Sequence, residues 1–438
     1  MTITKKIANY FEFSKHKTSY RTEILAGTST FLALAYIFVV NPSILGEAGI
    51  NKSAVLFATI VASGLATLLM GLWAKKPFVL APGMEMNSYV AFFVVLVLGF
   101  TWQEALGAVF WSGVIFFVLT LTGFRKKIIN AIPDKMKSGL ALSVGVFLML
   151  IALKLAGILV YDGVTLKGIG ILLSPLAYVF YFGLFAVLIL RKFKTPGAVL
   201  IGIILASIFA HFLGLGEVKE PVRISAEMFS ALFKLDFGVI FNLKILSVIL
   251  VLFLIDFYGS IAKFIGLTRR TSIVDEKGDM PQMKEAMLVD GSANSIGAVL
   301  GTTSPITYVE SAVGIAEGGR TGLTAVVAAI LMFAFIILTP LVNLVPLIAT
   351  TGVLFWVGIT LFPSKEDLKM YTKLDIFTIL VMIVSVIVTF AIDKALFLGF
   401  AIFIIGLIVS RRYKEIDPYM VLSTILLLIG WIFSVTLK

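Results

Sequence analysis

The sequence predicts an all-α, polytopic membrane protein with about fourteen transmembrane segments, arranged as two inverted halves of seven. Three observations predict this class: the composition, the length of the apolar blocks, and two interrupted segments about half a chain apart. Of the 438 residues, 59% are hydrophobic and 14% are charged, whereas about 25% are charged in an ordinary soluble domain. A water-soluble fold of this size could not bury so many apolar side chains.

Apolar blocks separated by short polar stretches run through the chain. Each approaches the roughly 20 residues that cross a hydrocarbon core about 30 Å thick. The predicted spans are 22–46, 53–74, 79–100, 104–122, 135–157, 174–191, 196–213, 245–267, 284–301, 303–318, 321–344, 346–362, 375–392 and 394–411. A further apolar stretch, 418–437, is either a fifteenth span or a helix packed at the membrane interface. The segment 218–244 is predicted to be an external loop that contains an interfacial helix.

The distribution of basic residues predicts the orientation. Although the net charge is +11, the basic residues form short clusters between apolar blocks and not a continuous face, which disfavours nucleic-acid binding. The clusters fall in every second loop, at Lys75/Lys76, Arg125/Lys126/Lys127, Arg191/Lys192/Lys194, Arg269/Arg270 and Arg320. The alternate loops, near Glu47, Glu104 and Glu217/Glu220, are poorer in Lys and Arg. By the positive-inside rule we expect a multi-pass protein of the cell membrane with a cytoplasmic, uncleaved N-terminus.

Several functional classes lack the residues they require. The chain has no cysteine, which excludes a thiol nucleophile and a Cys-ligated metal. The two histidines, His16 and His211, have no metal-like spacing. No Gly-x4-Gly-Lys-Ser/Thr loop occurs, which disfavours an ATP-driven pump. We therefore expect no enzyme activity, no metal and no cofactor, and any coupling should come from an ion gradient.

Two predicted spans contain residues that interrupt a plain helix. In segment three, Pro82, Gly83 and Asn87 lie within the first half of the span, and segment ten carries Pro305 and Glu310 in the same places. Pro305 follows Pro82 by 223 residues, and Glu310 follows Asn87 by 223 residues. In each, an extended stretch should precede a half-helix. Seven spans per half invert the second half relative to the first. Broken backbone is tolerated only where it is buried or lines a cavity, so a site near the midplane is predicted.

Two carboxyls inside spans are candidates for the chemistry of this site. Asp256 lies deep in segment eight and Glu310 opens the half-helix of segment ten. Burying each costs about 2.5–3.5 kcal/mol; each is either functional or a helix cap or interhelical hydrogen-bonding group. Amides at a half-helix N-terminus donate to a ligand, and a carboxylate there accepts from N–H groups and can take up a proton. Asn87 offers a donor and an acceptor without charge. Such a set suits a flat heterocycle with proton coupling.

Other polar residues near these segments are weaker candidates. Glu85 either faces the same cavity or caps its helix, and Ser88 beside Asn87 is a further secondary candidate. Lys263, one turn beyond Ser260, either extends to the cytoplasmic surface or pairs with an acid near the site. Asp290 and Glu104 are predicted to be structural.

Taken together, these motifs resemble the azaguanine-type purine permeases of the nucleobase–cation symporter superfamily, also called nucleobase–ascorbate transporters or xanthine/uracil permeases. The resemblance runs over nearly the whole chain. It begins at Thr18–Gly27 and Ala35–Pro42, and its most specific stretches are Ala81–Met84 followed by Asn87, and Tyr308–Ala312 with Gly318–Ala325.

The resemblance implies a core domain, 1–122 and 218–344, and a gate domain, 123–217 and 345–438. It also implies proton-coupled uptake of purine bases such as adenine, guanine and hypoxanthine. The base would contact Asn87, Asp256 and Glu310, with Glu310 and Asp256 in proton coupling and backbone amides near Glu310 adding hydrogen bonds. The expected partners are the base, the proton and the lipid bilayer. The oligomeric state, a homodimer included, stays open.

One segment departs from the pattern of the family it resembles. Where such proteins carry a second acid after Asp256, this chain has Gly259, and Lys263 replaces a threonine. The local charge changes by two units, which leaves the preferred base and the coupling ion open. The alternative is an anion transporter of the sulfate-permease type, which shares the seven-plus-seven architecture. Acids at the half-helix ends would repel an anion, although Lys263 weakens that objection. A passive channel fits broken helices around acids less well.

Overall fold

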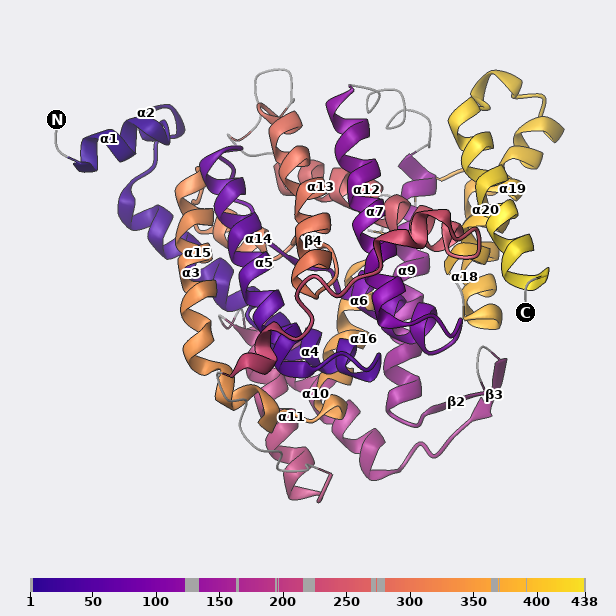
Figure 1. Ribbon diagram of the computed structural model, residues 1–438, viewed down its shortest axis with the longest axis horizontal. Helices are drawn as coiled ribbons and strands as arrows, with labels where there is room; N and C mark the ends of the chain where they lie inside the picture. The colour runs from indigo at the N-terminus through magenta and orange to yellow at the C-terminus, as the bar shows by residue number, and fades with distance from the viewer. Residues whose placement is uncertain are drawn as a thin grey trace.

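The computed structural model describes residues 3–122, 134–162, 165–193, 195, 197–215, 225–268, 273, 280–363, 369, 371–390 and 392–436. Three of the charge clusters used to predict the orientation, Arg125–Lys127, Glu217/Glu220 and Arg269/Arg270, lie outside these residues, as does Lys194 of the cluster Arg191/Lys192/Lys194. Within them the chain is mostly helical (Figure 1). Five helices are long and apolar enough to cross a membrane: Tyr20–Glu47, Lys52–Leu72, Trp102–Leu121, Pro175–Lys192 and Gly322–Thr339.

The first half of the chain begins with two short helices and continues as longer apolar ones. The helices are α1 (Ile3–Tyr10), α2 (Phe13–His16), α3 (Tyr20–Leu34), α4 (Ile37–Glu47), α5 (Lys52–Leu72), α6 (Met84–Ser88), the π-helix η1 (Tyr89–Val95), α7 (Trp102–Leu121), α9 (Asp134–Leu155), α10 (Pro175–Lys192) and α11 (Ala198–Phe212). Strand β1 (Leu80–Pro82) precedes α6, and β2 (Leu159–Asp162) and β3 (Thr165–Ile169) form a hairpin between α9 and α10.

The second half repeats the alternation of long helices and one interrupted segment. Its helices are the 3₁₀ helices η2 (Ala226–Phe229) and η3 (Phe237–Phe241), then α12 (Leu246–Thr268), α13 (Met283–Leu300), α14 (Ser311–Ala316), α15 (Gly322–Ala334), η4 (Phe335–Leu344), η5 (Leu347–Thr350), α16 (Thr351–Thr360), α18 (Lys373–Thr389), α19 (Ile392–Val409), η6 (Tyr413–Glu415) and α20 (Pro418–Thr436). Strand β4 (Pro305–Thr307) precedes α14.

Local sequence signals explain several helix ends. Thr101 and Glu104 form a reciprocal capping box at the start of α7, which confirms a structural role for Glu104. Asn51 caps α5 by accepting from two backbone amides. Predicted span one is divided at Ala35–Tyr36 into α3 and α4. This division places Tyr36 between two helices, where its side chain reaches the centre of the molecule.

The two interrupted segments meet in a buried two-stranded antiparallel sheet. Leu80 pairs with Thr307, Ala81 with Ile306, and Pro82 with Pro305. The two prolines that correspond in sequence are therefore direct partners in this sheet. Proline lacks a backbone N–H, and the pairing continues beyond the prolines through a bond from Gly83 N to the carbonyl oxygen of Ser304 at 3.1 Å. The expected extended stretches before half-helices in segments three and ten are confirmed, with α6 continuing as the unpredicted π-helix η1.

The helices pack in two sets. In the first set, α15 contacts both α3 and α5, α4 packs on α5 and α6, α7 packs on α12 and α13, and α14 packs on α3. In the second set, α9 packs on α16 and α18, α10 on α11 and α16, and α18 on α19. Figure 1 shows α3, α5 and α15 on one side of the molecule and α18, α19 and α20 on the other. We call these the first and second helix sets. The sheet of β1 and β4 belongs to the first set.

Two predicted peripheral segments have specific structures. Within 218–244, where a helix at the membrane interface is predicted, the described part, from residue 225, forms two short 3₁₀ helices, η2 and η3. Helix η3 is held against α7, because Asp236 N donates to the carbonyl oxygen of Gln103 at 3.0 Å and Trp111 Nε1 donates to that of Phe237 at 2.8 Å. Helix η2 packs on α5. The apolar stretch 418–437 forms α20, which packs on α12 and α19.

Candidate substrate site

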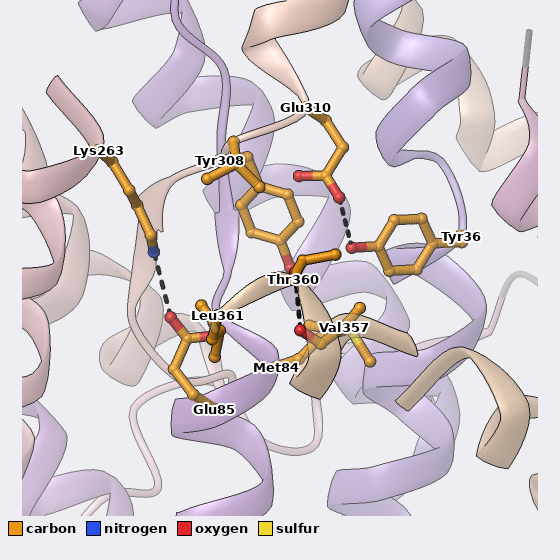
Figure 2. A pocket seen from close by; sticks show the side chains of 10 residues that line it. Tyr36, Met84, Glu85, Lys263, Tyr308, Glu310, Val357, Thr360 and Leu361 are labelled. Carbon is orange, nitrogen blue, oxygen red and sulfur yellow. Dashed lines mark hydrogen bonds and ion pairs between the residues drawn. The ribbon is translucent and has the colours of Figure 1, made fainter. Parts of the chain in front are cut away.

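A small pocket lies where the two helix sets meet. The first set supplies Tyr36, Met84, Glu85, Lys263, Tyr308, Val309 and Glu310 (Figure 2). The second set supplies Val357 and Thr360 of α16, and Leu361, which follows the helix. Its volume is about 40 Å³, well below the roughly 300–1,000 Å³ of ligand pockets. In the described conformation the pocket is therefore too small for a drug-sized ligand, and α16 forms one of its walls.

Glu310 is the acid at the end of the interrupted segment ten, and it lines this pocket. It is the residue before α14 and is 8% exposed. Its Oε1 accepts a hydrogen bond of 2.9 Å from the hydroxyl of Tyr36, as Figure 2 shows. Tyr36 is 1% exposed, so the bond is shielded from bulk water. The arrangement presents a carboxyl to the pocket while a phenol fixes one of its oxygens.

Tyr308 ties the two interrupted segments together beside Glu310. Its hydroxyl donates to the carbonyl oxygen of Pro82 at 2.6 Å, and its amide donates to the carbonyl oxygen of Val79 at 2.9 Å. Ser311 adds a third link, because its Oγ accepts from the amide of Val79 at 3.1 Å. The pocket floor is consequently a single hydrogen-bonded unit made from segments three and ten.

Lys263 and Glu85 form an ion pair in the same pocket. Lys263 Nζ lies 3.1 Å from Glu85 Oε1, and each side chain is 13% exposed. Lys263 comes from α12 and Glu85 from α6, and Figure 2 shows both side chains pointing toward one another. Of the alternatives that the sequence leaves open, the structure shows Lys263 paired with an acid at the site, and Glu85 facing the cavity.

Asp256 belongs to a buried polar network beside the pocket and does not line it. Ser260 Oγ lies 3.2 Å from Asp256 Oδ1 and also bonds Asp290 Oδ2. Asn294 Nδ2 donates to Asp256 Oδ2. Asp290 Oδ1 accepts from both the amide and the hydroxyl of Thr307, each at 2.9 Å. Asp290 thereby fastens β4 to α13, as expected of a structural acid.

Asn87 and Ser88 are buried in α6 but lie outside the pocket lining. Asn87 Oδ1 accepts from the hydroxyl of Thr303, and its Nδ2 lies 3.5 Å from the carbonyl oxygen of Pro82. The hydroxyl of Ser88 has no hydrogen-bond partner among the residues that the structure describes. Of the predicted site residues, the structure therefore brings Glu310, Glu85 and Lys263 together and leaves Asn87, Asp256 and Ser88 in the surrounding core.

Tyr36 and Tyr308 line the pocket although neither was a candidate from the sequence. Both are phenols within apolar segments, and a buried phenol requires a hydrogen-bond partner. That signal was present at Tyr308, two residues before Glu310. The signal at Tyr36 was weaker, because no neighbouring residue in the sequence indicates the break between α3 and α4.

An apolar helical chain with two broken segments paired at its centre, and a charged pocket between two helix sets, has the architecture of a membrane transporter. A protein-family model described as "Permease family", of the xanthine/uracil permeases, matches residues 21–396. The chain therefore belongs to this permease family of nucleobase–ascorbate transporters, and it is a multi-pass membrane transporter and not an enzyme.

Individual relatives agree with this assignment. The chain is 33% identical to the adenine permease AdeP of Escherichia coli over 97% of this chain and 95% of that protein. It is also 33% identical to the guanine/hypoxanthine permease PbuO of Bacillus subtilis over 96% of this chain and 99% of that protein. Among solved structures, the transmembrane domain of the cyanobacterial bicarbonate transporter BicA has a TM-score of 0.60 at 16% identity, covering 94% and 97% of the two chains. At that identity the likeness is one of fold.

Proposed function

We propose that this protein takes up purine nucleobases together with protons, and that the base binds in the pocket between the two helix sets. The observation that carries the proposal is Glu310, a nearly buried carboxyl that lines this pocket and is held by Tyr36. The adenine and guanine/hypoxanthine permeases similar to this chain support a purine as the substrate. A carboxyl that accepts from a base N–H and exchanges a proton would couple the two movements.

Alternating access follows from the position of the pocket. In the proposal, the first helix set, from 1–122 and 218–344, is the core, and the second, from 123–217 and 345–438, is the gate. Because α16 forms one wall of a cavity of about 40 Å³, a base can enter only when that wall moves away from the core. Movement of one set against the other around a fixed site is the usual mechanism of inverted-repeat carriers.

The seven-plus-seven repeat and a cytoplasmic N-terminus in the cell membrane belong to the same proposal. The repeat is supported by the pairing of Pro82 with Pro305, two residues 223 positions apart. An antiparallel pair of equivalent strands is what a two-fold axis in the membrane plane would produce.

Asp256 and Asn87 take supporting roles in this proposal. Their polar atoms bond Asn294, Ser260 and Thr303 inside the first helix set. They would hold the two broken segments in position, while Glu310 contacts the base.

An anion transporter of the sulfate-permease type is not favoured. The similarity to the bicarbonate transporter lies at 16% identity and concerns the fold. The pocket contains two carboxyls, Glu85 and Glu310, against one ammonium, Lys263, so its fixed charges do not favour an anion.

The test is uptake of radiolabelled hypoxanthine, adenine, guanine, uracil and sulfate into proteoliposomes, with and without an inward proton gradient. We expect saturable purine uptake that the gradient increases, and loss of accumulation in Glu310→Gln. The matched control is Glu104→Gln, because Gln preserves a capping box and Glu104 lies outside the pocket. Saturable sulfate uptake without nucleobase competition would refute the proposal. Unaltered gradient-driven accumulation in Glu310→Gln would remove Glu310 from the proton role.

A further inference from the structure

The ion pair of Lys263 and Glu85 places a hydrogen-bond donor and an acceptor side by side on the pocket wall. Nζ and Oε1 lie 3.1 Å apart, and both side chains are 13% exposed. A pair that served only to join α6 to α12 could be sealed from the cavity. Both residues instead line it, so a bound molecule would meet an ammonium and a carboxylate next to one another.

Within the part of the chain that the structure describes, the ammonium of Lys263 is the pocket side chain that has unused hydrogen-bond donors. The other pocket hydroxyls are committed: Tyr36 donates to Glu310 at 2.9 Å, Tyr308 to the carbonyl oxygen of Pro82 at 2.6 Å, and Thr360 to that of Val357 at 2.7 Å. Lys263 has three N–H groups, and its described hydrogen bond to Glu85 uses one of them. Among the pocket side chains, Lys263 is therefore the available donor for a carbonyl oxygen of a substrate.

Glu85 supplies the complementary acceptor. An ionised carboxylate accepts at two oxygens and donates at none, and Oε1 of Glu85 is the one that Lys263 contacts. The second oxygen remains for an N–H group beside the carbonyl. An N–H adjacent to a C=O in a ring is a lactam edge, and 6-oxopurines such as hypoxanthine and guanine carry one at N1 and C6.

We propose that Lys263 and Glu85 form hydrogen bonds with the lactam edge of the base and so make this transporter selective for 6-oxopurines over adenine. This inference rests on the proposed function, because it names the substrate class of the same pocket. Sequence similarity does not distinguish 6-oxopurines from adenine as the preferred substrate, since the chain is 33% identical both to an adenine permease and to a guanine/hypoxanthine permease.

Adenine bound in the same orientation meets the wrong partners. Its 6-amino group would point a donor at the ammonium of Lys263, and its N1 lone pair would face the carboxylate of Glu85. A site built to hydrogen-bond one group discriminates strongly against an analogue that leaves its polar groups unpaired.

The test is competition of hypoxanthine and adenine against labelled guanine on the purified full-length protein, with three variants. We expect wild type to bind hypoxanthine roughly tenfold or more tightly than adenine. Lys263→Met should weaken hypoxanthine by about tenfold and change adenine by less than about threefold, and Glu85→Gln should act in the same direction. The exchange Glu85→Lys with Lys263→Glu keeps an ion pair but reverses donor and acceptor, so preference should shift toward adenine.

Lys154→Met is the control, because Lys154 lies over the rings of Tyr161 and Phe390 away from the pocket. Equal weakening of both bases in Lys263→Met, or an exchanged pair that retains the wild-type preference, would overturn the inference and leave the pair a structural link. Absence of any nucleobase binding to wild type would instead defeat the proposed function. Thermal unfolding of each variant separates a loss of selectivity from a failure to fold, and the exchanged pair is expected to remain folded.

Discussion

Removing the hydroxyl of Tyr36 tests whether Glu310 is a charged group inside the protein. Tyr36→Phe keeps the aromatic ring and deletes the donor that lies 2.9 Å from Glu310 Oε1. A matched substitution is available at Tyr308, whose hydroxyl donates at 2.6 Å to a neutral backbone carbonyl, that of Pro82. Both tyrosines are buried, so the two variants differ chiefly in the charge of the acceptor.

The magnitude follows from the charge of the acceptor. A hydrogen bond to a charged group contributes about 1.5–3 kcal/mol to stability, and a neutral one about 0.5–1.5 kcal/mol. At neutral pH we therefore expect Tyr36→Phe to lower the free energy of unfolding by roughly 1 kcal/mol more than Tyr308→Phe. As the pH falls and Glu310 takes up a proton, the acceptor becomes neutral and the difference between the variants should disappear.

The assay is denaturant titration of both variants and wild type in detergent micelles over a pH series, with the free energy of unfolding as the readout. A cost of Tyr36→Phe that decreases toward acid pH, beside a constant cost of Tyr308→Phe, supports a carboxylate that protonates in place. Equal costs at every pH would show that Glu310 does not carry a titrating charge against Tyr36.

Three further predictions concern separate parts of the structure. Gly314→Ala places a Cβ 2.7 Å from the backbone oxygen of Ala26, so it should destabilise the protein by about 1–3 kcal/mol and weaken base binding. Gly259→Ala, whose Cβ would meet no neighbouring atom within 4 Å, should be tolerated. Equal unfolding curves for the two variants would refute this prediction. Burial lowers the pKa of Lys76 from 10.5 to about 8, so wild-type stability should rise from pH 8 to 10.5, where the unfolded chain retains a proton that the folded one has lost. Lys76→Met should raise the free energy of unfolding by on the order of 3 kcal/mol at pH 7 and by little at pH 11. A gain in stability that does not depend on pH in denaturant titrations would contradict the lowered pKa of Lys76. Asp256→Asn should cost about 1–3 kcal/mol of stability with hypoxanthine competition changed less than about threefold; a large loss of affinity at unchanged stability would place Asp256 against the base.

The interruptions at the centre of the fold could be predicted because their causes are local. Proline and glycine at 82 and 83, and proline at 305, disrupt helices wherever they occur, and the acid at 310 marks the second interruption as costly in a membrane. The equal spacing of Pro82 and Pro305 from Asn87 and Glu310 linked the two segments. The sequence thus predicted the two segments that pair in the central sheet, and it predicted Glu310 as a candidate, which lines the pocket.

The assembly of the site depends on contacts that the sequence does not show. Whether Lys263 extends to the surface or pairs depends on where α6 brings Glu85, a position 178 residues away in the chain. In the sequence, Asp256 and Asn87 were polar groups within spans, as Glu310 was. In the structure they are hydrogen-bonded to core neighbours, Asp256 to Asn294 of α13 and Asn87 to Thr303 before β4. Tyr36 reaches Glu310 across 274 residues. The position of α16 in the pocket wall likewise follows from packing between distant helices.

The most direct test of the account is proton movement driven by the base itself. Proteoliposomes with a pH-sensitive dye inside would receive hypoxanthine outside, in the absence of any imposed gradient, and the internal pH would be followed for wild type and Glu310→Gln. If Glu310 couples the base to a proton, hypoxanthine should acidify the interior of wild-type vesicles and leave the internal pH of Glu310→Gln vesicles unchanged. Accumulation of hypoxanthine by wild type without any change in internal pH would contradict it.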